Sequence, residues 1–246
     1  MVRTPKELES MRKAGKVVAA ILAETREAVR PGVTTLDLDR VAREVILRFG
    51  ARSNFLGYNG FPAVICTSKN STIVHGIPGD AVRLEEGDLI SIDAGAIVEG
   101  YHGDAAITVG VGTISKAAAR LVQVTEESLY AGIDQMVAGN HLHEIGRAVE
   151  AVAKRAGLGV IRDYVGHGIG TEMHEPPNVP NFWPGRPGPV LRVNEVYAVE
   201  PMLTLGGEET AVLSDGWSVV TADGTWAAHF EHTIAITEDG PEIFTK

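Results

Sequence analysis

Four acidic residues stand inside or beside short apolar segments whose composition predicts β-strands. They are Asp93 in LISIDAG, Asp104 in YHGDAAITV, Glu200 in YAVEPML and Glu231 in HFEHTIAIT. Asp and Glu are almost never fully buried unless they are paired or bound to a metal. One such acid is most simply an edge-strand residue that faces water. Four in similar contexts indicate a shared site.

Four carboxylates cannot all stay ionised at short range in a low-dielectric site without cations. Two divalent metal ions would balance their charge, and a pair of metals about 3.5–4 Å apart is a recurring hydrolytic device. A nitrogen ligand would favour a transition metal over magnesium or calcium. The candidates are His167 and His174 in YVGHGIGTEMHEPP and His75 in STIVHGIPG, although each alone is more simply a hydrogen-bonded structural histidine. No role is assigned to the others, which are His102, His141, His143, His229 and His232.

Competing catalytic motifs are weak or missing. The sequence contains no His-Glu-x-x-His helix and no Gly-x-x-x-x-Gly-Lys phosphate loop. A cysteine hydrolase built on Cys66 and a histidine is a formal alternative. Cys66, the single cysteine, lies in an apolar strand-like segment, where an inert buried thiol is the simpler interpretation.

The elements that must position these residues can be read from capping and periodicity. Thr4, Pro5 and Glu7 predict the start of a helix, which Pro31-Gly32 ends. Further helices are predicted over about 35–50, 115–137 and 142–156, and strands over about 61–112 and again near Glu200 and Glu231. The segment 176–189 holds six of the twelve prolines and predicts an extended, non-helical loop.

This order of helix, helix and strands occurs twice, which indicates an internal repeat. A shift of 107 residues pairs Gly32 with Gly139 and Gly50 with Gly157. The same shift places Asp93 on Glu200. We therefore expect one catalytic domain over residues 1–246, built from pseudo-symmetric halves of about 1–112 and 113–246.

Composition is that of a globular protein, with 44% hydrophobic and 22% charged residues. The net charge of −10 argues against direct binding of nucleic acid and against adhesion to anionic membranes. No apolar run approaches the 18–20 residues or so that would span a bilayer. We expect a cytoplasmic protein.

The segments STIVHGIPG, SIDAGAIVEGYHGDAA, YVGHGIGTEMHEPP, AVEPML and HFEHTIAIT, in this order, resemble those of type I methionine aminopeptidases along nearly the whole chain. The resemblance implies the α/β (α+β) pita-bread fold, in which two helix-helix-strand halves enclose a dinuclear metal site. It implies removal of the N-terminal methionine from nascent polypeptides when the second residue is small, by attack of a metal-bridging water or hydroxide. It also implies two divalent ions (manganese, iron, cobalt or zinc), a monomer and transient contact with the ribosome.

The resemblance also carries roles onto individual residues. The implied metal ligands are Asp93, Asp104, His167, Glu200 and Glu231. Glu200 would also take the proton of the attacking water, His174 would stabilise the oxyanion, and His75 would contact the scissile amide nitrogen. The implied pocket for the methionine side chain consists of Tyr58, Phe61, Cys66, Met173 and Trp217, beside the substrate contacts of His75 and His174. Asn59 and Met173 depart from the histidine and the aromatic residue that are common in bacterial relatives.

Two alternatives remain open. An X-Pro-directed peptidase of the same fold would share the five ligands, but such enzymes usually carry an additional N-terminal domain. A non-catalytic pita-bread binding protein would typically lose ligands, and all five are present here. The interval from His174 to Glu200 is too short for the helical insertion of type II enzymes.

Overall fold

Four long helices form where the capping signals predict them. The computed structural model describes residues 1–246, and its helices are α1 (Pro5–Ala28), α2 (Thr35–Arg48), α3 (Lys116–Ile133) and α4 (His143–Ala156). Thr4 and Glu7 form the expected capping box, and Thr34 with Asp37 forms a second one at α2. The third helix ends at Ile133, earlier than predicted, because Asp134 begins a turn.

The strands form four sheets. A long antiparallel hairpin of β4 (Leu89–Val98) and β5 (Tyr101–Gly110) is flanked along β4 by β1 (Arg52–Ser53) and β2 (Ile65–Lys69). The largest sheet has the order β15-β14-β9-β7-β8. Its strands are β7 (Gly166–Gly168), β8 (Glu175–Val179), β9 (Val196–Val199), β14 (His232–Thr237) and β15 (Gly240–Ile243). The smaller sheets comprise β6 (Gly159–Val160), β10 (Met202–Thr204) and β13 (Ala227–His229), and β3 (Thr72–Val74), β11 (Thr210–Val212) and β12 (Val219–Thr221). A single 3-10 turn, η1, covers Tyr58–Gly60.

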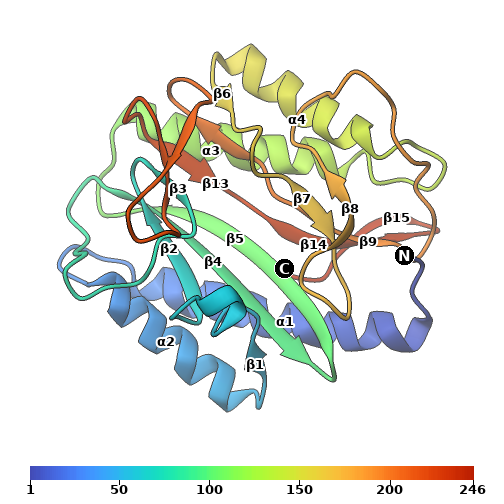
Figure 1. The fold of residues 1–246 in the computed structure, drawn as a ribbon, viewed down its shortest axis with the longest axis horizontal. Coiled ribbons are helices and arrows are strands. Elements are labelled where there is room, and N and C mark those ends of the chain that lie inside the picture. Colours follow the sequence, from blue (N-terminus) through green and yellow to red (C-terminus); the bar gives the residue numbers. More distant parts are fainter.

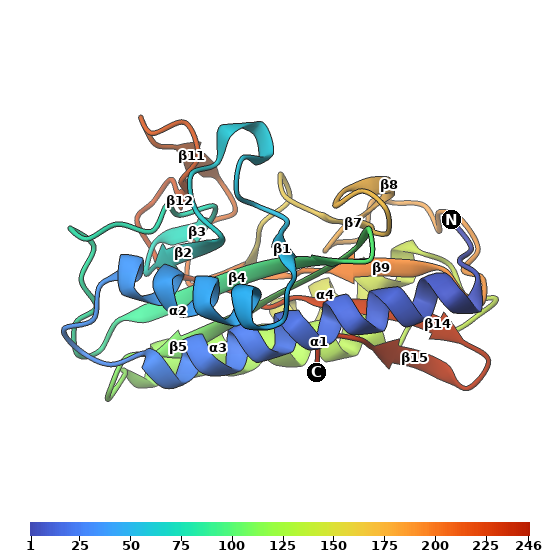
Figure 2. The ribbon, with the colours of Figure 1, turned by 90° about the horizontal axis from the view of Figure 1, so that it is seen from below.

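The helices and the short strands lie on opposite sides of the central strands. Figure 1 shows α1 and α2 beside the β4–β5 hairpin, and α3 and α4 beside the second half of the chain. In Figure 2, α1 and α3 lie below the central strands, while β3, β11 and β12 rise above them. Apolar faces of α1 and α2 pack on β4 and β5 in one core cluster, and those of α3 and α4 pack on β9 and β14 in another. The side opposite the helices is therefore free to form a binding surface.

The two halves of the chain are joined by four hydrogen-bonded residue pairs along β5, one of which is the bond from His102 N to Gly170 O at 2.8 Å. Thr108 Oγ1 accepts from His229 N at 2.9 Å and donates to His229 O at 2.8 Å. Ala106 and Glu231 form a backbone bridge. Thr233 Oγ1 accepts from Asp104 N at 2.9 Å and donates to Asp104 O at 2.8 Å. Two threonine hydroxyls thus replace backbone hydrogen bonds where the halves meet.

This junction yields a prediction about stability. Thr233 and the backbone of Asp104 are buried, so Thr233→Val leaves a buried N–H and a buried C=O without a partner. An unsatisfied buried group costs about 1–3 kcal/mol, and we expect T233V to lose about 3 kcal/mol of unfolding free energy. Urea unfolding of the metal-free protein measures the loss. The control is T210V, whose hydroxyl bonds only Asp163 at the surface; an equal effect of both variants would refute the assignment.

The internal repeat stays a prediction, and the backbone agrees with it at the paired glycines. Gly32 and Gly139 have φ of 91° and 90°, and Gly50 and Gly157 have φ of 63° and 67°. Positive φ is accessible to glycine at little cost. The same backbone requirement therefore occurs before and after both α2 and α4.

The proline-rich segment differs in part from its prediction. It is non-helical, but its first residues pair with β7 as strand β8, at the edge of the largest sheet. An edge strand tolerates proline because one side of its backbone needs no donor. None of the helices is both long and apolar enough to cross a membrane.

Candidate metal centre and substrate pocket

Every residue that the sequence and its resemblance singled out for the site lines one cavity of about 300 Å³. The residues are Tyr58, Phe61, Cys66, His75, Asp93, Asp104, His167, Met173, His174, Glu200, Trp217 and Glu231. They come from both halves of the chain.

Strand register brings the four carboxylates together. Asp93 lies in β4 and Asp104 in the adjacent β5. Across the two strands, Asp93 is paired with Ala106, and Asp104 is paired with Gly95. Glu200 follows the last residue of β9, and Glu231 lies between β13 and β14. The bridge between Ala106 and Glu231 places the acid of the second half against the hairpin of the first. Two of the acids are thus within strands and two are at strand ends.

Burial dominates the electrostatics of these acids. It raises the pKa of Asp93 to about 7, against a hydrogen bond from Asp104 that lowers it. The pKa of Asp104 is raised well above its usual value by burial and by the charges of Glu231 and Asp93. Burial and repulsion within the cluster also raise the pKa values of Glu200 and Glu231 well above the ordinary range. Bound cations would offset both the cost of burying these charges and the repulsion between them.

The donor set fits a divalent metal. Ligand atoms of Asp104, His167 and Glu231 lie within 4.8 Å of one another, and all three side chains are buried. One carboxylate oxygen each of Asp93, Asp104 and Glu231 is buried without a hydrogen-bond partner. Buried polar atoms are rarely left unpaired, so these oxygens are available as ligands for a bound cation.

His167 is held in the form that a metal requires. Its Nδ1 lies 2.9 Å from the carbonyl oxygen of Gly168 and donates to it, which leaves the Nε2 lone pair facing the cluster. Nε2 is 3.5 Å from Glu200 Oε1. Burial, with a contribution from His174, lowers the pKa of His167 to about 3. The imidazole is therefore neutral, as a ligand must be.

The two remaining predicted histidines face the same cavity. His174 Nδ1 lies 2.9 Å from the Tyr58 hydroxyl, and its ring centroid is 4.3 Å from that of His167. His75 follows β3 with a positive φ of 60°, and its ring packs edge-on against Tyr164 and Trp217. Burial lowers the pKa of His75 to about 4. Burial also lowers the pKa of His174. A neutral imidazole has one nitrogen that donates a hydrogen bond and one that accepts.

The apolar end of the cavity adjoins the carboxylates. Phe61 packs edge-on against Trp217 at 5.1 Å between ring centroids, and Met173 and Cys66 complete the wall. Burial, together with the nearby carboxylates, raises the pKa of the Cys66 thiol well above its usual value. Cys66 is therefore a protonated wall residue, which argues against the cysteine-hydrolase alternative. Asn59 also lines the cavity, with a positive φ of 47°.

Three wall residues and the role of one buried histidine did not follow from the sequence patterns. Phe55, Tyr164 and Val165 also line the cavity. Tyr164 and Val165 directly precede Gly166-His167, and this position next to a candidate site residue could have indicated that they line the cavity. His229 lies behind Glu200, at 3.8 Å between Nε2 and Oε2. His229 precedes Glu231 by two residues. Because side chains alternate along a strand, this spacing could have indicated that the two side chains lie on the same face.

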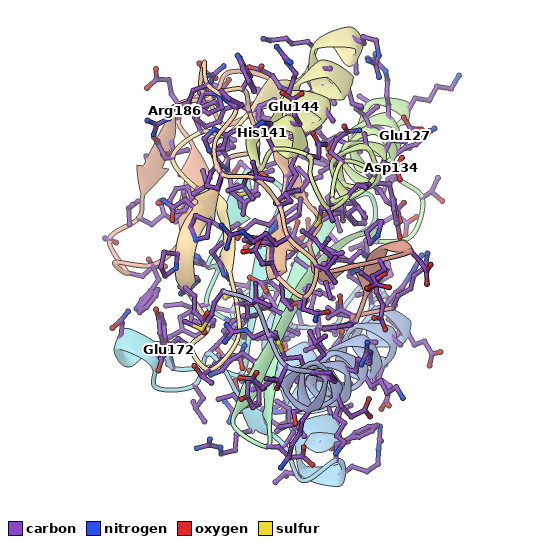
Figure 3. The ribbon with its side chains drawn as sticks, turned by 90° about the vertical axis from the view of Figure 1, so that its right-hand side faces the viewer. Glu127, Asp134, His141, Glu144, Glu172 and Arg186 are labelled. Atoms are coloured by element: carbon purple, nitrogen blue, oxygen red, sulfur yellow. The ribbon has the colours of Figure 1, made fainter.

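Other polar side chains lie away from this cavity. Figure 3 shows His141 with Glu144 and Arg186 around the start of α4, while Glu172 lies separately on the loop between β7 and β8. His141 Nδ1 is 3.0 Å from the carbonyl oxygen of Gly188, which gives that histidine a structural partner.

Comparisons with known proteins agree with this geometry. The sequence profile of Metallopeptidase family M24 matches residues 9–238. The chain is 52% identical to methionine aminopeptidase 1 of Mycobacterium tuberculosis, over 99% of this chain and 94% of that protein. It superposes on the crystal structure of methionine aminopeptidase from Thermotoga maritima with a TM-score of 0.97, at 43% identity and full coverage of both chains.

The chain also matches a more distant structure, in which only the fold is similar. Prolidase from Pyrococcus furiosus superposes with a TM-score of 0.79 at 22% identity, and this chain covers 65% of it. That likeness concerns the fold alone. The predicted pita-bread fold is confirmed by these superpositions, and the buried cluster of Asp, His and Glu fits divalent metal binding. The chain belongs to metallopeptidase family M24.

Proposed function

We propose that this protein is an aminopeptidase that removes the N-terminal methionine from polypeptides whose second residue is small. The observation that carries the proposal is a cavity in which four carboxylates and three histidines adjoin an apolar wall containing Met173, Phe61 and Trp217. Relatives with full coverage and about half of their residues identical bear the name methionine aminopeptidase.

The proposed metal ligands are Asp93, Asp104, His167, Glu200 and Glu231, which would hold two divalent ions from the group manganese, iron, cobalt and zinc. When bound, such ions polarise a carbonyl group and acidify a water molecule. The unpartnered oxygens of Asp93, Asp104 and Glu231 support this ligand set.

The chain's own groups would then handle the proton and the developing charge. Glu200 accepts the proton of the attacking water as the carbon–oxygen bond forms, and returns it to the amide nitrogen as the carbon–nitrogen bond breaks. The Tyr58 hydroxyl lies 2.9 Å from Nδ1 of His174, and in the tautomer in which it donates to Nδ1 the imidazole hydrogen is on Nε2, where it would donate to the oxyanion. His75 would hold the scissile amide nitrogen.

The apolar wall supplies selectivity for methionine. An unbranched thioether fits a narrow pocket of aromatic rings and sulfur, with which its own sulfur makes favourable contacts. Tyr58, Phe61, Cys66, Met173 and Trp217 are the proposed pocket residues. That the protein is a monomer in the cytoplasm, with transient ribosome contact, stays a prediction.

Peptide cleavage tests the proposal. The purified protein, loaded with manganese, cobalt or iron, is expected to release methionine from Met-Ala-Ser and to leave Met-Lys-Ser uncut, because the larger second residue does not fit. Released methionine is measured by amino-acid analysis. Failure on Met-Ala-Ser with all three metals would refute the assignment. Preferential cleavage of X-Pro dipeptides would support the X-Pro peptidase instead.

A further inference from the structure

His229 is a buried histidine beside the carboxylate cluster, and the proposed mechanism gives it no role. It ends strand β13, and only 1% of its surface is exposed. Its Nε2 atom is buried and has no hydrogen-bond partner. A buried polar atom without a partner requires an explanation in a native structure.

The backbone of His229 is fixed from the other half of the chain. Both its N–H and its C=O bond to Thr108 Oγ1. Because that hydroxyl donates to the carbonyl oxygen, Ser91 Oγ, at 2.8 Å, must donate to Thr108 in turn. Ser91, Thr108 and His229 are all buried. The backbone from which the imidazole projects is therefore held by β4 and β5, and burial of the side chain leaves the ring little freedom.

The imidazole points at Glu200. The Glu200 carboxylate lies between two histidines, with Oε1 at 3.5 Å from His167 Nε2 and Oε2 at 3.8 Å from His229 Nε2. Nε2 of His167 carries a lone pair and no hydrogen, because the ring hydrogen is on Nδ1. The lone pairs of Oε1 and of His167 Nε2 repel each other, so both atoms would be held together only by binding a cation. Oε2 has no hydrogen-bond partner, and His229 Nε2 lies 3.8 Å from it.

We propose that His229 is a positioning residue for Glu200, donating a hydrogen bond from Nε2–H to Oε2 and leaving Oε1 directed at the cation shared with His167. The bond would close by a small rotation of the Glu200 carboxyl group, since hydrogen bonds in active sites are often long before ligands bind. Partners that orient a metal-bound carboxylate typically contribute 10–100-fold in affinity. The inference rests on the proposed function, because it takes Glu200 as a ligand and as the base.

Cobalt binding tests the inference apart from catalysis. The metal-free wild type, H229L and H229Q are titrated with Co²⁺, and both heat and the visible absorption of bound cobalt are recorded. H229L keeps the volume and loses the donor, and it is expected to raise the dissociation constant by about 10–100-fold and to alter the cobalt spectrum. H229Q retains an N–H donor and is expected to recover most of the affinity. H143Q is the control, since His143 is a buried histidine whose ring bonds the Arg186 carbonyl outside the cavity.

The outcomes separate the inference from the proposed function. H229L with the affinity and spectrum of the wild type overturns the inference, as does H229Q that binds cobalt no better than H229L. If H229L does not fold, H229M serves as the apolar variant, because methionine has the length of glutamine without its donor. A wild type that binds cobalt but leaves Met-Ala-Ser uncut refutes the proposed function and leaves the test of His229 intact. On Met-Ala-Ser, H229L is expected to lower kcat with little change in KM.

Discussion

Replacement of Asp104 by asparagine is expected to abolish metal binding and activity together, while the metal-free protein becomes more stable at neutral pH. Asp104 is 4% exposed, has one unpartnered oxygen, and belongs to the group whose ligand atoms lie within 4.8 Å of one another. Loss of this proposed metal ligand is expected to remove several kcal/mol of transition-state stabilisation, which corresponds to about a 1,000-fold fall in activity. Metal content by mass spectrometry and methionine release from Met-Ala-Ser measure the two losses.

The gain in stability follows from the direction of the pKa shifts. A carboxyl group whose pKa is higher in the folded state contributes stability that is complete below its unfolded pKa and is lost as pH rises through its folded pKa. For Asp93 that interval runs from about 4 to about 7. Burial raises the pKa values of Asp104, Glu200 and Glu231 as well, so their contributions to stability change with pH in the same direction. The metal-free wild type should therefore unfold at a lower temperature at pH 8 than at pH 5.5.

Asp104→Asn removes one of these charges and should make that dependence on pH shallower. Thermal unfolding in the presence of a chelator at several pH values measures it. The control is D163N, which changes a surface carboxylate that bonds Thr210 outside the cavity. If D104N keeps its metal, or if the slope of its melting temperature against pH equals that of the wild type, the assignment of Asp104 is wrong.

Replacement of His174 by alanine is expected to reduce turnover about 100- to 1,000-fold and to leave the metal content unchanged. The proposed function of His174 is to donate a hydrogen bond to the oxyanion, and removal of one such donor typically has an effect of this size. The imidazole lies beside the His167 ring but is not among the clustered ligand atoms. If the H174A variant retains its metal, His174 acts as a hydrogen-bond donor and not as a metal ligand.

The measurements for His174 are kcat and KM on Met-Ala-Ser, with metal analysis of the same sample. H174Q keeps an N–H donor of similar reach and should recover part of the turnover. H141A is the control, because His141 bonds the Gly188 carbonyl near α4, away from the cavity. Loss of metal in H174A, or full activity in that variant, would contradict the assigned role.

Local patterns determined a large part of the fold. Thr4 with Glu7, and Ser115, mark helix starts because their side chains satisfy the free backbone N–H groups of the first turn. Gly157 ends α4 because it adopts a left-handed conformation that other residues avoid. Such signals depend on neighbouring residues alone and can be read without a structure. The proline segment was harder, since pairing of β8 with β7 depends on a strand nearby in space.

The candidate site could be predicted to the level of its residues but not of its contacts. Acids in apolar segments signal a site because burial of a charge is costly, and the resemblance assigned their roles. The sequence could not show that Thr108 and Thr233 tie the halves together at His229 and Asp104, because those pairs are over a hundred residues apart. It also gave His229 no role, since a histidine acquires one only from what its nitrogens face.

The sequence by itself therefore determined which residue types carry the chemistry, the order of the elements and the acidic character of the site. Tertiary structure alone decided the register of β5 against residues 229–233, which brings the acids of both halves together and raises their pKa values. It also decided that Glu200 lies between His167 and His229, at 3.5 and 3.8 Å. The physical reason is that burial and distance are properties of the packed chain, and electrostatic free energies depend on both.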